Sequence, residues 1–193
     1  LYVLQSTLAT KFSSSRDSVE HDDGCSMLFQ FKEDMSINHS ASFDPHAYPK
    51  VASWKLNTSD CCLWDGVECS GKSSGHVIGL DLSSSFLYGP IKSNNSLFNL
   101  IHLRTLNLAD NDFQFSQIPS RIRCLLHLAN LNLSYSLFSG QVPNEISQLS
   151  QLISLDLTQN PLKLQAFSFK NLVQNITDTL RELFLSGVNI DSE

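Results

Sequence analysis

The chain has 193 residues, and its 41% hydrophobic content with only 17% charged residues excludes a disordered composition. Thirteen basic residues stand against nineteen acidic ones, so the net charge is −6 (13 − 19), and no block of lysine or arginine is present. This balance argues against nucleic acid or direct contact with an anionic membrane. We expect a protein, peptide or carbohydrate partner.

The chain begins with the apolar segment LYVLQSTLAT, which is typical of the end of a secretory signal peptide with cleavage near Ala9. A plain flexible N-terminus is the alternative, because the charged start of such a signal is absent. We therefore assign residues 1–22 to a leader remnant or a flexible N-terminus. No apolar run reaches the 18 or so residues that predict a membrane-spanning helix.

Cysteines gather before residue 70, where the segment CCLWDGVEC follows Cys25. Adjacent Cα atoms lie about 3.8 Å apart, whereas a disulfide needs roughly 4.4–6.8 Å, so Cys61 and Cys62 are poor partners for each other. Two connectivities remain: Cys25–Cys61 with Cys62–Cys69, or the crossed pairing. A zinc site is the rival interpretation, but its ligands come as two separated cysteine pairs. We expect disulfides, and therefore an oxidising compartment.

Sequons for N-glycosylation also indicate an oxidising compartment, although any single sequon would be weak evidence. The candidate glycosylation sites are Asn38, Asn57, Asn94, Asn132 and Asn175.

The segment after Cys25 has helical spacing, with Leu28, Phe31 and Met35 on one face and Phe29 beside them. Large aromatic residues near disulfides usually pack in a core. We therefore expect Trp54 and Trp64 to fill space between this helix and the first coil of the fold.

From about Val77 the chain repeats a pattern of the form L-x-x-L-x-L-x-x-N-x-L. The first leucines of its L-x-L pairs are 26, 25, 24 and 28 residues apart, at Leu80, Leu106, Leu131, Leu155 and Leu183. One strand per repeat predicts a parallel sheet with inward leucines, and because a single repeat cannot bury them, the repeats stack into a curved solenoid. We expect an α/β leucine-rich-repeat solenoid of about five repeats.

Two asparagines, Asn111 and Asn160, occupy the ninth position, where a buried amide can bond the backbone at the corner between coils. Ser85 and Ser136 replace them in other repeats and can make some of these bonds, whereas Val188 cannot. Glycine and proline in phrases such as LFSGQVP predict a turn into irregular or 3-10 backbone on the convex side.

Little in the sequence indicates catalysis. Gly71 to Gly75 matches G-x-S-x-G, but that motif needs a strand before it, a helix after it, and acid and histidine partners for Ser73. The six histidines show no ligand spacing. Cys124 has no obvious partner and is predicted to be a small buried filler. We expect no catalytic residue, no metal site and no cofactor.

The stretch from Cys25 onward resembles the amino-terminal part of plant extracellular leucine-rich-repeat receptor-like proteins, the class that includes fungal-resistance receptors. The resemblance rests on CSMLFQFK, ASW, CCLWDGVEC, GHVIGLDLS and LFSGQVP. It implies the pairing Cys25–Cys61 with Cys62–Cys69, and a cap at residues 23–75 followed by repeats at residues 76–193. Longer members carry further repeats, a membrane helix and a tail. We therefore expect a C-terminally truncated chain.

The open face of the sheet should carry ligand contacts. The third, fifth, seventh and eighth positions of the repeat are expected there, because strand side chains alternate. The candidates are Asp81, Asn107, Asp110, Tyr135, Asp156 and Phe184, although packing of Phe184 against a further repeat is an equal alternative. A glycan at Asn132 would cover the middle of this face. Partners are then expected to approach the side of the coils or later repeats.

These features favour an extracellular recognition module that binds a protein, peptide or glycan in plant defence signalling, with a possible co-receptor kinase. The location would be extracellular, or the outer face of the plasma membrane in a full-length receptor. A secreted inhibitor of pectin-degrading enzymes is the alternative. A short co-receptor ectodomain fits poorly, because that type carries a single cysteine in place of the CC pair.

Overall fold

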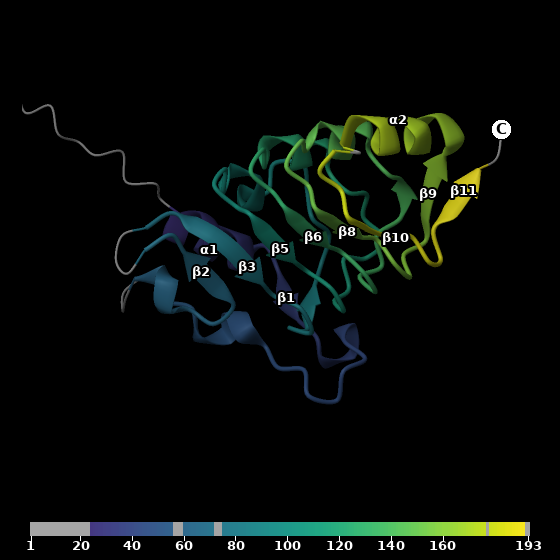
Figure 1. Cartoon of the computed structure of the whole chain (residues 1–193). Coiled ribbons are helices and arrows are strands. Elements are labelled where there is room, and N and C mark those ends of the chain that lie inside the picture. The colour runs from purple at the N-terminus through teal and green to yellow at the C-terminus, as the bar shows by residue number, and fades with distance from the viewer. Residues whose placement is uncertain (1–23, 56–59, 72–74, 177, 192–193) are drawn as a thin grey trace, which may run out of the picture.

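The computed structural model describes residues 24–55, 60–71, 75–176 and 178–191. Figure 1 shows a row of strands that runs from a cap at the N-terminal end to the last coil. The strands form one sheet in the order β10-β8-β6-β5-β3-β2, in which β2 is antiparallel and the other neighbours are parallel. Its members are β2 (Val67–Cys69), β3 (Val77–Asp81), β5 (Thr105–Asn107), β6 (Asn130–Asn132), β8 (Ser154–Asp156) and β10 (Glu182–Phe184).

The register of the sheet confirms the predicted alignment of the repeats. Leu80 pairs with Leu106, and the row continues through Leu131 and Leu155 to Leu183. The first four are almost completely buried and Leu183 packs partly against the same core. Each coil buries its leucines against the next, so the core is continuous along the solenoid.

The corner asparagines bond the backbone as expected. Asn111 Nδ2 donates to the carbonyls of Leu82 at 2.8 Å and Leu108 at 3.0 Å, while its Oδ1 accepts from the amides of Ser85 and Leu87. Asn160 repeats this arrangement two coils later.

The convex side contains 3-10 turns as predicted, but also regular structure that the sequence did not lead us to expect. The 3-10 helices are η4 (Ser96–Asn99), η5 (Ser120–Cys124) and η6 (Asn144–Gln148). A second parallel sheet combines β7 (Gly140–Gln141), β9 (Leu162–Gln165) and β11 (Asn189–Asp191). In β9, Leu162 and Leu164 are buried while Lys163 and Gln165 are exposed, a period of two that marks a strand.

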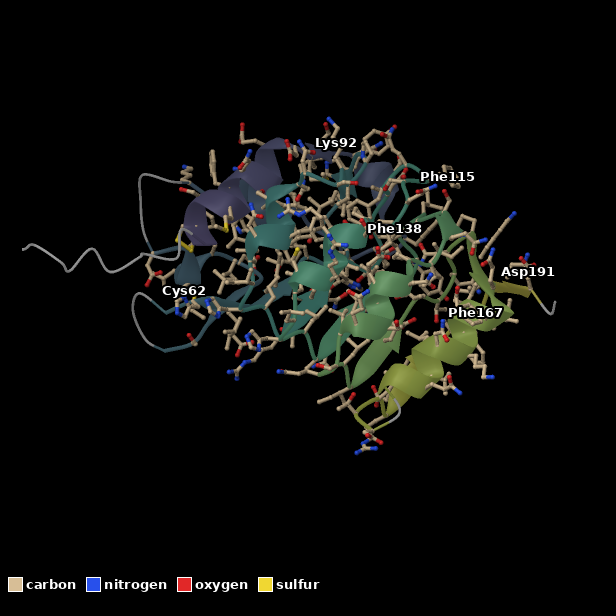
Figure 2. All side chains as sticks on the ribbon, turned by 90° about the horizontal axis from the view of Figure 1, so that it is seen from above. Cys62, Lys92, Phe115, Phe138, Phe167 and Asp191 are labelled. Carbon is tan, nitrogen blue, oxygen red and sulfur yellow. A yellow bond between two sulfur atoms is a disulfide. The ribbon has the colours of Figure 1, made fainter. Side chains whose placement is uncertain are left out.

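An α-helix, α2 (Ala166–Ile176), replaces the 3-10 turn of the fourth coil. The longest interval between L-x-L pairs, from Leu155 to Leu183, supplies the residues for this helix. Leu172 of α2 is buried against the core. Figure 2 shows Phe138 among the coils and Phe167 on α2, where 71% of Phe167 is exposed.

The cap confirms the expected helix, disulfides and aromatic core. In α1 (Gly24–Glu33), Leu28 and Phe31 are fully buried. Trp54 stacks on Trp64 with ring centroids 5.2 Å apart. Disulfides join Cys25 to Cys61 and Cys62 to Cys69, which is the pairing that the resemblance implied. The cap also contains two short 3-10 helices, η2 (Lys50–Ser53) and η3 (Cys61–Leu63).

One cap segment does more than cover the end of the first coil. After α1, β1 (Ser36–Ile37) pairs antiparallel with β4 (Leu87–Tyr88), and η1 (His39–Ala41) follows. The amide of Tyr48 then donates to the carbonyl of Ser84 at 3.2 Å. This segment is seen in dark blue at the lower edge of the molecule in Figure 1. It lies along the edge where the chain leaves the strands.

Candidate recognition surface

The strand register places the fifth positions of the repeats in one row across the sheet. This open row consists of Asp81, Asn107, Asn132, Asp156 and Phe184. It brings together the predicted candidates Asp81, Asn107, Asp156 and Phe184. Phe184 is 49% exposed on β10.

Part of the hydrogen-bonding capacity of the row is used to end each strand. Asn107 Oδ1 accepts from the amide of Ala109 at 3.1 Å, and Asp156 Oδ1 accepts from the amide of Thr158 at 2.9 Å. Such side-chain contacts two residues ahead stabilise turns. These polar residues therefore shape the turn as well as facing solvent.

Asp81 is also tied to the cap. Its carboxylate lies 3.2 Å from Lys50 Nζ and accepts hydrogen bonds from the amide and hydroxyl of Ser83. Burial alone would raise the pKa of Asp81, but the bonds from Ser83 and the charge of Lys50 lower it below the ordinary value. Asp81 is thus an ionised anchor for the cap.

The eighth positions lie beyond the strand ends, in left-handed backbone. The φ values are 48° for Ser84, 55° for Asp110, 53° for Tyr135 and 55° for Gln159, and Gly187 follows at 84°. Non-glycine residues seldom adopt this conformation. The prediction grouped these positions with the alternating strand residues, whereas the structure turns them onto the edge of the solenoid.

Asp110 joins this edge to the cap. Its carboxylate accepts hydrogen bonds from the hydroxyl of Ser42, the amide of Phe43 at 2.9 Å and the hydroxyl of Ser84 at 2.8 Å. Burial alone would raise the pKa of Asp110, but the bonds from Phe43, Ser42 and Ser84 lower it. The predicted ligand candidate Asp110 is therefore engaged within the protein.

A groove lies beside this contact. Its volume is about 670 Å³, and we call it the cap groove; its lining residues are Phe43, Asp44, Asp110, Tyr135, Leu137 and Gln159. Phe43 is 84% exposed and Tyr135 is 50% exposed. The repeat pattern identified Tyr135 as a candidate. It could not identify Phe43, because the segment around Phe43 is not part of a repeat.

The glycosylation candidates occupy different environments. Asn94 is exposed, whereas Asn132 is partly buried in the open row. Asn38 caps η1, where its Oδ1 accepts from the amide of Ser40. Asn57 and the side chain of Asn175 lie outside the described residues, as does Ser73.

Three histidines stack on successive coils, which the sequence analysis did not predict. His76 and His102 have ring centroids 4.0 Å apart, and His102 and His127 are 6.2 Å apart. The intervals of 26 and 25 residues equal those of the leucines, and this was the available signal. Gln151 Nε2 lies 3.5 Å from His127 Nδ1 and continues the stack.

Within the described ranges, one group of three potential metal ligands is close enough to share an ion, namely Cys25, Asp60 and Cys61. Its two sulfurs are bonded to each other as a disulfide. Cys124 is a free, half-buried thiol. No helix in the described part of the chain is both long and apolar enough to cross a membrane.

Known proteins match both the cap and the repeats of this chain. Residues 25–70 match the family described as leucine rich repeat N-terminal domain. Receptor-like protein 7 of Arabidopsis thaliana is 42% identical over 211 aligned positions, which cover 100% of this chain and 19% of the relative. Receptor-like protein Cf-9 of Solanum pimpinellifolium is 41% identical over 202, covering 100% and 23%. The chain thus spans about a fifth of the length of these relatives.

Solved structures agree on the fold. The BIR3–SERK2 complex of Arabidopsis thaliana contains a chain with a TM-score of 0.68 and 28% identity, covering 89% of this chain and 84% of that one. A plant ice-binding protein has a TM-score of 0.65 and 29% identity, covering 89% and 49%. Because the relatives match across the whole chain, the protein belongs to the plant leucine-rich-repeat receptor-like proteins, in which it corresponds to the N-terminal cap and the first repeats of the ectodomain.

Proposed function

We propose that the chain is the N-terminal part of an extracellular receptor ectodomain that recognises a protein, peptide or glycan in plant defence signalling. The observation that carries this proposal is the match to receptor-like proteins across both the cap and the repeats. The class that it resembles includes fungal-resistance receptors. The disulfides and sequons favour an extracellular location, or the outer face of the plasma membrane in the full-length protein.

The geometry supports recognition more than catalysis. The polar residues of the open row bond to their own turns, and Asp81 and Asp110 bind the cap. A nucleophile needs a base within hydrogen-bond reach and a third group that orients the base. We therefore propose binding as the role of this surface.

A co-receptor kinase ectodomain is a suitable second partner. The BIR3–SERK2 structure, which contains a chain similar to this one, is a complex between two proteins. The similarity to an ice-binding protein shows that the fold alone does not decide the ligand. The comparisons give no support to the alternative of a pectin-enzyme inhibitor.

The test is to express the full-length protein in leaf cells that lack it and to challenge them with apoplastic fluid from infected leaves. We expect an oxidative burst that cells without the receptor do not show. In parallel, the secreted chain is assayed against fungal polygalacturonase, with no inhibition expected. Inhibition without any burst would contradict the receptor function and favour the inhibitor.

A further inference from the structure

The cap groove is formed by two parts of the chain that are distant in sequence. Phe43 and Asp44 of the cap form one wall. The floor follows the eighth positions of three consecutive coils, Asp110, Tyr135 and Gln159. The groove therefore lies on the edge of the solenoid, beside the open row.

Hydrogen bonds hold the cap wall in place without a ligand. Asp110 accepts from the amide of Phe43 and the hydroxyl of Ser42, and the amide of Tyr48 donates to the carbonyl of Ser84. The wall is thus fixed on both sides of Asp44. A preformed site loses less conformational entropy when it binds a ligand.

The lining is apolar with a negative charge. Phe43 and Tyr135 expose large parts of their rings, and Leu137 lies with them in the groove. Asp44 and Asp110 bring carboxylates, while no lysine or arginine is among the described lining residues. The low pKa of Asp110 keeps its charge, although its bonds to Ser42, Phe43 and Ser84 leave it little room for a new donor.

These features favour a cationic side chain over a sugar as the occupant. An aromatic face attracts an ammonium or guanidinium group, and a nearby carboxylate adds to this attraction. A sugar needs many directed hydrogen bonds, and here the groups left for it are chiefly Asp44, the exposed amide of Gln159 and the hydroxyl of Tyr135. The volume of about 670 Å³ falls in the ordinary range for a site that takes a few side chains.

We propose that the cap groove binds a short extended peptide in which an arginine or lysine adjoins an apolar side chain. The cation lies between Asp44 and the rings of Phe43 and Tyr135, and the apolar side chain packs on Leu137. The inference rests on the proposed recognition function, whose ligand class it narrows to a basic peptide. It also places that contact at the edge of the solenoid.

One neighbouring side chain competes with the ligand for Asp44. His46 Nδ1 lies 3.4 Å from Asp44 Oδ1, and the His46 amide donates to the same oxygen at 2.8 Å. The His46 side chain is 92% exposed, so it can move aside. A His46→Ala variant should therefore bind the same peptides at least as well as the unmodified chain.

The test uses the whole chain and two pools of capped hexapeptides, one with Arg-Leu fixed at the centre and the other with Glu-Leu. Cellohexaose serves as the glycan probe. Binding is followed by amide chemical shifts in NMR titrations. We expect the Arg-Leu pool to shift the amides of Phe43, Asp44 and Tyr135, and the other two probes to leave them unchanged.

Variants assign the binding to the groove. Phe43→Ala and Asp44→Asn alter exposed side chains and should preserve the fold, while weakening Arg-Leu binding about tenfold and about threefold. Phe167→Ala on α2 and Asp191→Asn on β11 are matched exposed controls and should change nothing. Retained binding in both groove variants, equal binding of the Glu-Leu pool, cellohexaose shifts in the groove, or no binding of the Arg-Leu pool would each overturn the proposal.

The two proposals fail in different ways. A burst in leaf cells that persists with Phe43→Ala and Asp44→Asn overturns the groove as the ligand site while the receptor function stands. Peptide binding in the groove without any burst overturns the receptor function alone.

Discussion

The carboxylate of Asp110 accepts a hydrogen bond of 2.9 Å from the backbone amide of Phe43, 67 residues earlier in the chain. This bond joins the second coil to the cap, and the hydroxyl of Ser42 adds a second bond. Long-range contacts of this kind hold the cap against the solenoid from the side. The two disulfides act elsewhere in the cap, at η3.

Removal of the Asp110 carboxylate should release this part of the cap. Asp110→Ala is expected to accelerate hydrogen exchange at the amides of Phe43 and Asp44, and to lower the free energy of unfolding by about 1 kcal/mol. Asp112→Ala is the matched control, because Asp112 accepts a bond only two residues away, from Gln114. Equal effects of the two variants on Phe43 exchange would contradict the role of Asp110.

Acid should have the same effect as this substitution. The pKa values of Asp81 and Asp110 lie below the ordinary value, so their contributions to stability are complete above about pH 4 and disappear as the pH falls through the folded pKa values. We expect faster exchange of the Tyr48 amide near pH 2.5 than near pH 5, after correction for intrinsic exchange. The double variant Asp81→Asn, Asp110→Asn should show a weaker pH dependence. An unchanged pH dependence would assign the effect to other carboxylates.

The corner asparagines should contribute more to the free energy of unfolding than the serines that replace them in other repeats. Asn111→Ala removes an acceptor for two buried amides and a donor to buried carbonyls, so we expect it to cost about 3 kcal/mol. Ser136→Ala removes only the hydroxyl bonds to the carbonyls of Leu108 and Ser134, and should cost about 1 kcal/mol. Urea unfolding measures both. The reverse order would show that the amide does not organise the corner.

The repeats could be predicted because one leucine register determines strand, face and neighbour together. The row from Leu80 to Leu183 therefore followed from spacing alone, and the corner role of Asn111 followed from its place in the same frame. The pairing of Cys25 with Cys61 came from the resemblance and is confirmed by the structure. Spacing could exclude a Cys61–Cys62 bond but could not choose between the remaining partners.

The missed features lack a local signal. The cap segment from β1 to Tyr48 has neither helical nor strand periodicity, and single polar contacts such as Phe43 to Asp110 hold it. The left-handed turn at Tyr135 depends on the backbone path between coils and not on a glycine. The open-row residues stay predictions as ligand contacts.

The disulfide that closes the longer loop should stabilise the cap more, because loop-closure entropy grows with the logarithm of loop length. Their partners are 36 and 7 residues apart, so loss of Cys25–Cys61 should cost about 4 kcal/mol and loss of Cys62–Cys69 about 2.5 kcal/mol. Paired cysteine-to-alanine variants are compared by denaturant unfolding, with the fluorescence of Trp54 and Trp64 as the reporter. Cys124→Ser is the control, since that thiol is free. A larger loss from the shorter loop would show that loop closure does not set the order.

The final prediction concerns Asn132 as a glycosylation site. This residue lies in the open row between Asn107 and Asp156. Its Oδ1 accepts from the amide and hydroxyl of Ser134, so the sequon is folded into the turn after β6. A glycan on Nδ2 would cover the middle of the row and direct partners to the edge of the coils.

We expect glycopeptide mass spectrometry of the secreted full-length ectodomain to find Asn132 occupied. Asn132→Gln should leave Arg-Leu peptide binding unchanged, because the cap groove lies beyond the strand ends. Asn94→Gln removes an exposed sequon and is the control. The contrary result has two parts: Asn132 is unoccupied, and the defence response is lost in Asp156→Ala but kept in Phe43→Ala. In that case only the variant in the open row has removed a ligand contact. The recognition site would then lie on the open row.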